Sequence, residues 1–118
     1  MSYTNAAKDA AVNAIRALLT SNIGHLSAHT ADPGATGASE VAGSTRGSST
    51  FPAASGGTGS TGSQGSIAIP GAAAVTHVGL WTAASGGTYV TSFALSPTET
   101  FSSAGGTLKY TPTLTATG

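Results

Sequence analysis

The chain of 118 residues has the length of one domain and can bury a sizeable apolar core. It has no cysteine, which excludes disulfides, thiolate metal sites and a cysteine nucleophile. Charged residues make up only 7% of the chain, against roughly 25% in ordinary domains. Because the four basic residues are scattered and balance four acidic ones, neither nucleic acid nor a membrane is an expected partner.

An amphipathic helix is predicted from about residue 4 to about residue 21. Apolar residues recur there at spacings of three and four and therefore share one face. Ser2 or Thr4 can cap the first amides of this helix, and Asn22 and Gly24 tolerate the left-handed turn that ends many helices. We expect the apolar face to pack on a sheet, with docking on a partner as the alternative. This face consists of Ala11, Val12, Ile15, Leu18 and Leu19.

A β-rich region is predicted from residue 25 to residue 117. Short runs of β-branched and aromatic residues alternate there with clusters of Gly, Ser and Pro. Asp32-Pro33-Gly34 is a strong turn signal, because Pro presets one dihedral angle and Gly accepts an unusual one. The predicted strands span residues 25–30, 49–51, 66–69, 74–81, 88–95 and 107–116.

Side-chain alternation distinguishes the roles of two of these strands. Residues 74–81 are apolar on both faces, which is typical of a central strand. Residues 107–116 alternate between an apolar face and a face of Thr and Lys, which indicates one buried and one exposed side. Pro112 has no N–H to donate, so we expect this strand at an edge.

The hexapeptide AASGGT occurs at residues 53–58 and again at 83–88. The second copy lies where a hairpin must join two predicted strands, and Gly-Gly supplies the backbone freedom for its tip. Repeated turn chemistry is our interpretation, and a duplicated half-domain is the alternative. Residues from about 55 to 66 are almost entirely Gly, Ser and Thr, which predicts a long loop.

These elements predict a mainly β protein with one N-terminal amphipathic helix. The expected architecture is a small β-sandwich or a jelly-roll-like domain, built as a single domain over residues 1–118.

Three residues near the first turn, His25, His29 and Asp32, raise the question of a metal or an acid/base site. On a helix the two histidines would share a metal, but on a strand they would lie about 13 Å apart. Gly24 and Pro33 favour the strand, so we predict histidines that bond to their neighbours. One alternative is a metal shared between chains at a symmetry axis. A weaker alternative is a metal hydrolase built on His25, His29 and Asp32. His77 is predicted to be an interior or interface side chain.

The motif GTGSTG at residues 57–62 has the glycine spacing of a dinucleotide-binding loop. No buried strand leads into it and no helix follows, so we attribute the match to low-complexity sequence. Nucleophile-elbow and phosphate-loop motifs are absent from the sequence. We therefore predict no catalytic, cofactor-binding or metal-binding residues, and no cofactor.

The chain resembles a family of small virion proteins of tailed bacteriophages, described as tail-fibre-like or minor structural proteins. The resemblance lies in residues 5–41 (NAAKDAAVNAIRALLTSNIGHLSAHTADPGATGASEV) and residues 76–108 (THVGLWTAASGGTYVTSFALSPTETFSSAGGTL). The shared elements are the amphipathic start, the HTADPG turn, GLW, and ALSP after an ASGG turn. This resemblance implies a non-enzymatic structural protein of the virion, made in the host cytoplasm.

Within that class, the sequence favours a capsid decoration or minor capsid protein that binds the outer surface of the particle. A shaft-forming fibre usually has long repeats or heptads, which this chain lacks. Expected partners are the major capsid protein or tail proteins, with the chain in a homo-oligomer such as a trimer. The interface candidates are Ile15, Leu18, Leu19, Trp81, Tyr89 and Tyr110.

Two alternative functions remain open at this point. The first is a tail-associated or tail-fibre protein. The second is a glycan-binding module on the virion surface, in which Trp81, Tyr89 or Tyr110 would be an exposed stacking platform.

Overall fold

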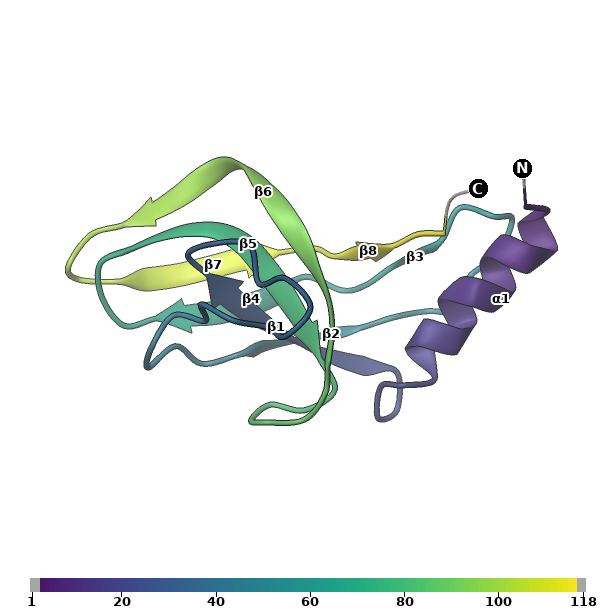
Figure 1. Ribbon diagram of the computed structural model, residues 1–118, viewed down its shortest axis with the longest axis horizontal. Coiled ribbons are helices and arrows are strands. Elements are labelled where there is room, and N and C mark those ends of the chain that lie inside the picture. The colour runs from purple at the N-terminus through teal and green to yellow at the C-terminus, as the bar shows by residue number, and fades with distance from the viewer. Residues whose placement is uncertain (1–2, 117–118) are drawn as a thin grey trace.

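The computed structural model describes residues 3–116, and it shows an elongated body of antiparallel strands with a helix at one end (Figure 1). The prediction of a mainly β fold with one N-terminal helix is confirmed. Thr117, where the predicted β-rich region ends, lies outside the described residues. In chain order the elements are α1 (Asn5–Arg16), β1 (Ile23–His29), β2 (Gly47–Thr50), β3 (Ser60–Thr61), β4 (Gly65–Ile69), β5 (Ala73–Trp81), β6 (Tyr89–Phe101), β7 (Gly106–Tyr110) and β8 (Thr113–Leu114).

Helix α1 is capped by Thr4, one of the two predicted cap residues, and it ends earlier than predicted. The other candidate, Ser2, lies outside the described residues. The Thr4 hydroxyl accepts a hydrogen bond of 3.1 Å from the Ala7 amide. After Arg16 the chain tightens into a turn, because the Leu19 amide bonds to the carbonyl of Arg16, three residues back. Ser21 and Asn22 then adopt positive φ angles of 53° and 61°, which prevents a regular helix from reaching residue 21.

The larger sheet contains four antiparallel strands in the order β2-β1-β5-β6. Strand β5 pairs on both sides, so its predicted central position is confirmed. The second AASGGT copy forms the β5–β6 hairpin, where the Thr82 amide bonds to the Thr88 carbonyl at 3.0 Å. Gly86 and Gly87 have φ angles of 64° and 76° there, which explains the two glycines of the repeat.

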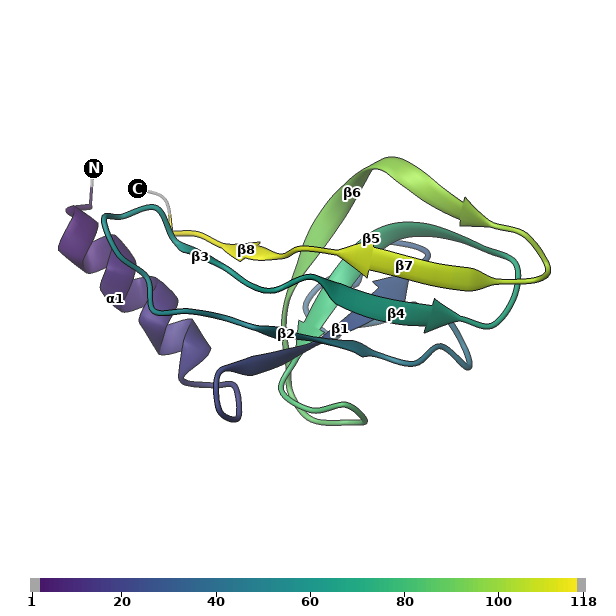
Figure 2. The same cartoon turned by 180° about the vertical axis from the view of Figure 1, so that it is seen from behind.

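The second layer consists of two ribbons, β4–β7 and β3–β8, that follow one another along the long axis (Figure 2). Pro112 separates β7 from β8, as expected for a residue that cannot continue a ladder. Strand β3 lies inside the stretch that the sequence predicts to be a loop. It pairs with β8 through Ser60–Leu114 and Thr61–Thr113.

The two layers are joined along one side and open along the other. Thr45, just before β2, exchanges backbone hydrogen bonds of 3.0 and 3.2 Å with Ala68 of β4. On the opposite side, β6 and β7 each pair with one strand only, β5 and β4 respectively. Their free edges therefore face the same opening.

The apolar core fills the space between the layers and continues to α1. Leu108 and Leu114 point inward from the C-terminal strands, as their alternation predicts, while Thr107 and Lys109 are exposed. Among residues 3–116, no helix is long and apolar enough to cross a membrane. The core residues are Val12, Leu19, Leu26, Ala28, Phe51, Ala54, Ile67, Ile69, Val75, Val78, Leu80, Leu108 and Leu114.

Candidate functional site

The two histidines of the opening motif lie on strand β1, as predicted. His25 pairs with Trp81 and His29 pairs with His77 on the neighbouring strand. Asp32 accepts a hydrogen bond of 2.9 Å from the Gly34 amide and so stabilises the turn that it begins. Across the described residues, no three His, Asp or Glu side chains come close enough to hold a metal ion.

His29 is fully buried and has a defined partner at each ring nitrogen. Its Nδ1 lies 2.7 Å from the Ala38 carbonyl oxygen, and its Nε2 lies 2.6 Å from Ser27 Oγ. A carbonyl oxygen can only accept, so Nδ1 carries the proton and Nε2 accepts from the Ser27 hydroxyl. Burial lowers the pKa of His29, which favours this neutral ring.

The Ser27–His29 contact has the length of a nucleophile–base pair, but its surroundings give it a structural role. Both side chains are fully buried, and the Trp81 indole N–H donates a 2.8 Å hydrogen bond to the same Ser27 hydroxyl. The hydroxyl thus accepts from Trp81 and donates to His29. This chain of hydrogen bonds ties the loop at Ala38 to strands β1 and β5.

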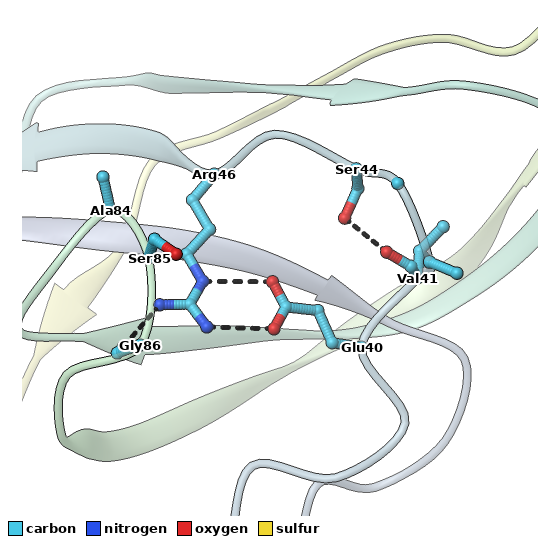
Figure 3. A pocket seen from close by; sticks show the side chains of 9 residues that line it. Glu40, Val41, Ser44, Arg46, Ala84, Ser85 and Gly86 are labelled. Carbon is cyan, nitrogen blue, oxygen red and sulfur yellow. Dashed lines mark hydrogen bonds and ion pairs between the residues drawn. The ribbon is translucent and has the colours of Figure 1, made fainter.

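Arg46 connects the same loop to the β5–β6 hairpin (Figure 3). Its guanidinium forms a bidentate ion pair with Glu40, with both N···O distances 3.0 Å. Its Nη1 also donates to the carbonyls of Ala83 and Gly86, at 2.9 Å each. Glu40, Arg46 and Gly86 line a polar pocket of about 340 Å³. Every guanidinium nitrogen already has a partner, so the pocket has no unused cation with which to bind an anion.

The Trp81 ring packs against the Arg46 cluster, which consists of Arg46, Glu40, Ala83 and Gly86. The Arg46 guanidinium carbon lies 4.0 Å from the ring centroid, and the Tyr89 ring packs against Trp81 edge-on with centroids 5.3 Å apart. Gly37, with a φ of 74°, lies so close that a Cβ there would overlap the indole. A sugar stacking on the Arg46 side of the ring would first have to displace Arg46.

Sequence reasoning did not find the Arg46 cluster or the Ser27–Trp81 bond. Arg46 bonds to carbonyls 37 and 40 residues away, and Ser27 lies 54 residues from Trp81. No local spacing signals such contacts. The pairing of β1 with β5 was the missing information, and the sequence alone does not specify that register.

The predicted interface residues are divided between the core and the surface. Leu19 is 5% exposed and belongs to the core, whereas Leu18 is 59% exposed. Trp81 and Tyr89 are half-buried in the Arg46 cluster, and Tyr110 packs against Phe93 with ring centroids 5.7 Å apart.

Ile15 and Leu18 lie on the open side of the fold. With β6 and β8 they line a groove of about 440 Å³, and a second groove of about 360 Å³ continues between β6 and β7. We call this strip the open seam: Ile15 and Leu18, residues 90–99 of β6, and residues 108–115 of β7–β8. The Phe93–Tyr110 contact crosses the seam between the two grooves.

Comparison with protein families gives a match over nearly the whole chain. The family described as podophage GP4 fiber I protein gp80 matches residues 3–116. The chain belongs to this family. It is thus a member of a tail-fibre-like family of structural proteins from tailed-phage virions, as the resemblance indicated. No curated protein is similar enough to count as a match.

The sequence elements that carry the resemblance to small virion proteins of tailed phages occupy structural positions in this fold. The HTADPG turn leaves β1 at its buried histidine, and GLW closes β5 with Trp81 in the Arg46 cluster. The ALSP segment lies on the free edge of β6. The resemblance therefore rests on packing, turns and strand edges.

Proposed function

We propose that this chain is a non-enzymatic structural component of a fibre of a tailed-phage particle, where it binds other virion proteins. The observation that carries the proposal is the match of residues 3–116 to a fiber protein family. This replaces capsid decoration, which the sequence favoured because the chain lacks long repeats and heptads. The family description supports the fibre alternative better, and a short chain can form one segment of a fibre whose length comes from other proteins.

The paired polar groups of the interior and the low charge of the chain support a structural role. The polar groups around Ser27 and around Arg46 bond to their neighbours, and the described residues include no buried side-chain N or O atom without a partner. The surface is poor in charge and rich in Ser and Thr, which suits a hydrated contact between proteins. Such a module acts by burying surface between copies or between different virion proteins.

Fractionation of purified particles tests this assignment. Heads and tails are separated by gentle disruption, and peptides of this chain are quantified by mass spectrometry in each fraction against head and tail reference proteins. We expect the chain to follow the tail proteins. Recovery with the major capsid protein would support decoration of the capsid instead, and absence from both fractions would overturn the assignment to the virion.

A further inference from the structure

A loop covers part of the outer face of the larger sheet, over strand β1. Side chains alternate along a strand, and Leu26 and Ala28 point into the core. Ser27 and His29 therefore lie on the outer face, yet both are fully buried. Residues 30–46, between β1 and β2, lie over them, and we call this segment the covering loop. While this loop is in place, His29 has no surface exposed to water.

The hydrogen bonds of His29 leave no place for a second ring proton. Nδ1 already holds the proton that it donates to the Ala38 carbonyl, so protonation adds a hydrogen at Nε2, 2.6 Å from Ser27 Oγ. The Ser27 hydroxyl would then face two donors, this Nε2–H and the Trp81 indole N–H. Its own hydrogen would lose its acceptor, because Ser27 Oγ has no third partner among residues 3–116. A charged His29 is therefore incompatible with the hydrogen bonds under the loop.

The charged groups around His29 do not remove this conflict. Glu40 of the covering loop attracts a positive ring, but both of its carboxylate oxygens already pair with Arg46 at 3.0 Å (Figure 3). Arg46 and His77, which pairs with His29 across β1 and β5, act against a positive charge there. Strands β2 and β6 bring no charged side chain to this part of the sheet. Burial is the largest cause of the lowered pKa of His29, and neither Glu40 nor the hydrogen bond to the loop carbonyl cancels it.

Few contacts hold the covering loop in place. Besides the pair of Glu40 and Arg46, the Val41 N–H donates to a carbonyl of β1 at 2.9 Å, and the Thr30 N–H closes the loop on itself at 3.1 Å. Most of residues 30–40 are exposed, and none of them belongs to the apolar core. A segment that buries little apolar surface opens at a lower free energy than the core beneath it. The loop is thus the part of the structure around the buried histidine that can move while the sheet stays folded.

We propose that the covering loop is an acid-operated latch: a second ring proton on His29 releases the loop while both sheets keep their strand pairing. The neutral ring holds the loop through the Ala38 carbonyl, whereas the charged ring reaches water once the loop has moved away. Release also removes Gly37 from the Trp81 indole, which gains access to solvent. The latch acts within one chain, and it does not depend on the position of the protein in the particle.

Amide hydrogen exchange of the natural chain, followed by NMR between pH 5 and 7.5, tests the latch. The Thr30 and Val41 amides report on the loop, because its release breaks the hydrogen bonds that they donate. After correction for the intrinsic pH dependence of exchange, their protection factors should fall by up to about tenfold per pH unit below the ordinary histidine pKa of 6.5, the limit for one proton. Protection factors that do not change with pH would overturn the proposal.

Low concentrations of urea distinguish local release from global unfolding. Urea promotes global unfolding, which exposes much surface, but has little effect on the release of a short loop. The exchange of Thr30 and Val41 should therefore stay nearly independent of urea. Amides of β5, which pairs on both sides, should exchange faster as urea is added. An equal dependence on urea would show that the loop leaves only when the whole fold unfolds, and the latch would be wrong.

His29→Gln removes the titrating ring and keeps a donor and an acceptor in the side chain. In this variant the protection of Thr30 and Val41 should no longer change with pH. His25→Gln is the matched control, because His25 lies on the same strand and pairs with Trp81. It should keep the pH dependence of the natural chain. Persistence of that dependence in His29→Gln, or its loss in the control, would overturn the role of His29.

The ring titrations of the natural chain decide the matter if His29→Gln does not fold. NMR follows the ring signals of all three histidines over the same pH range. The fall in protection of the loop amides should level off at the pH at which the His29 ring titrates. If it levels off instead with the titration of His25 or His77, the latch does not operate through His29.

Discussion

The indole N–H of Trp81 on β5 donates a 2.8 Å hydrogen bond to the buried hydroxyl of Ser27 on β1. This side-chain contact joins the two neighbouring strands. The same hydroxyl donates to His29 at 2.6 Å, and His29 in turn bonds to the Ala38 carbonyl at 2.7 Å. The loop after β1 is therefore held over the sheet by hydrogen bonds that run through two fully buried side chains, Ser27 and His29. Substitutions in and around this cluster should change the stability of the fold in ways that its geometry determines.

Ser27→Ala should destabilise the fold by about 1–3 kcal/mol, because it leaves the Trp81 N–H and His29 Nε2 unpaired in the interior. Urea unfolding followed by the fluorescence of the only tryptophan measures this loss. Ser48→Ala, at an exposed position of β2, is the control and should change stability by less than about 0.5 kcal/mol. Equal stability of the two variants would contradict the proposed role of Ser27.

Acidification should weaken the fold through His29. Burial holds the pKa of folded His29 below its ordinary value of 6.5, so the unfolded chain binds more protons in mildly acidic solution. The free energy of unfolding should therefore fall as pH drops below about 6.5, until the folded pKa is reached. This one group contributes at most about 1.4 kcal/mol per pH unit.

His29→Gln isolates this effect from that of the other ionisable groups. Denaturant unfolding at several pH values between 5 and 8 gives, for each of the two proteins, the dependence of the free energy of unfolding on pH. The difference in stability between wild type and variant should shrink as pH falls. A difference that stays constant across this range would contradict a lowered pKa for His29.

Gly37→Ala should be costly, because the new Cβ would overlap the Trp81 ring and because the backbone there has a φ of 74°. Gly34→Ala separates these two causes, since Gly34 has a φ of 63° but open space around it. We expect about 1 kcal/mol for Gly34→Ala, from backbone strain alone, and at least about 1 kcal/mol more for Gly37→Ala. If thermal or urea unfolding shows that both variants lose the same stability, the Trp81 indole moves aside at no cost in free energy, which would contradict this prediction.

Arg46→Lys should destabilise the protein by about 1–3 kcal/mol even though the charge is kept. Lysine cannot form the bidentate pair with Glu40 while also bonding to Ala83 and Gly86, and it lacks the planar group that covers Trp81. Urea unfolding measures the loss, and the Trp81 emission spectrum reports the change over its ring. Lys109→Arg, at an exposed site, is the control for exchanging Arg and Lys. If Arg46→Lys loses no more stability than this control, the role assigned to Arg46 is refuted.

The local elements of this fold were predictable where a side-chain pattern marks them. The alternation of residues 107–116 correctly separated buried Leu108 and Leu114 from exposed Lys109. The Asp32 turn and the hairpin at residues 83–88 followed from Pro and Gly chemistry. In each case the signal lies within a few residues of the feature that it predicts.

The features that the sequence did not reveal depend on contacts between distant segments. Strand β3 has only two residues within a Gly/Ser-rich stretch, and it forms because β8 offers a backbone partner. The predicted helix stops at Arg16 because the following turn directs Leu19 into the core. The Arg46 cluster and the open seam arise from the order of strands in the sheets, which no periodicity in this chain specifies.

Immunogold labelling of intact particles, with an antibody against this chain, is the most direct test of its role as a fibre component. We predict gold confined to the tail and its fibres. Gold spread over the heads would contradict the fibre assignment and would support capsid decoration. Unlabelled particles, with the protein present only in extracts of infected cells, would contradict its place in the virion altogether.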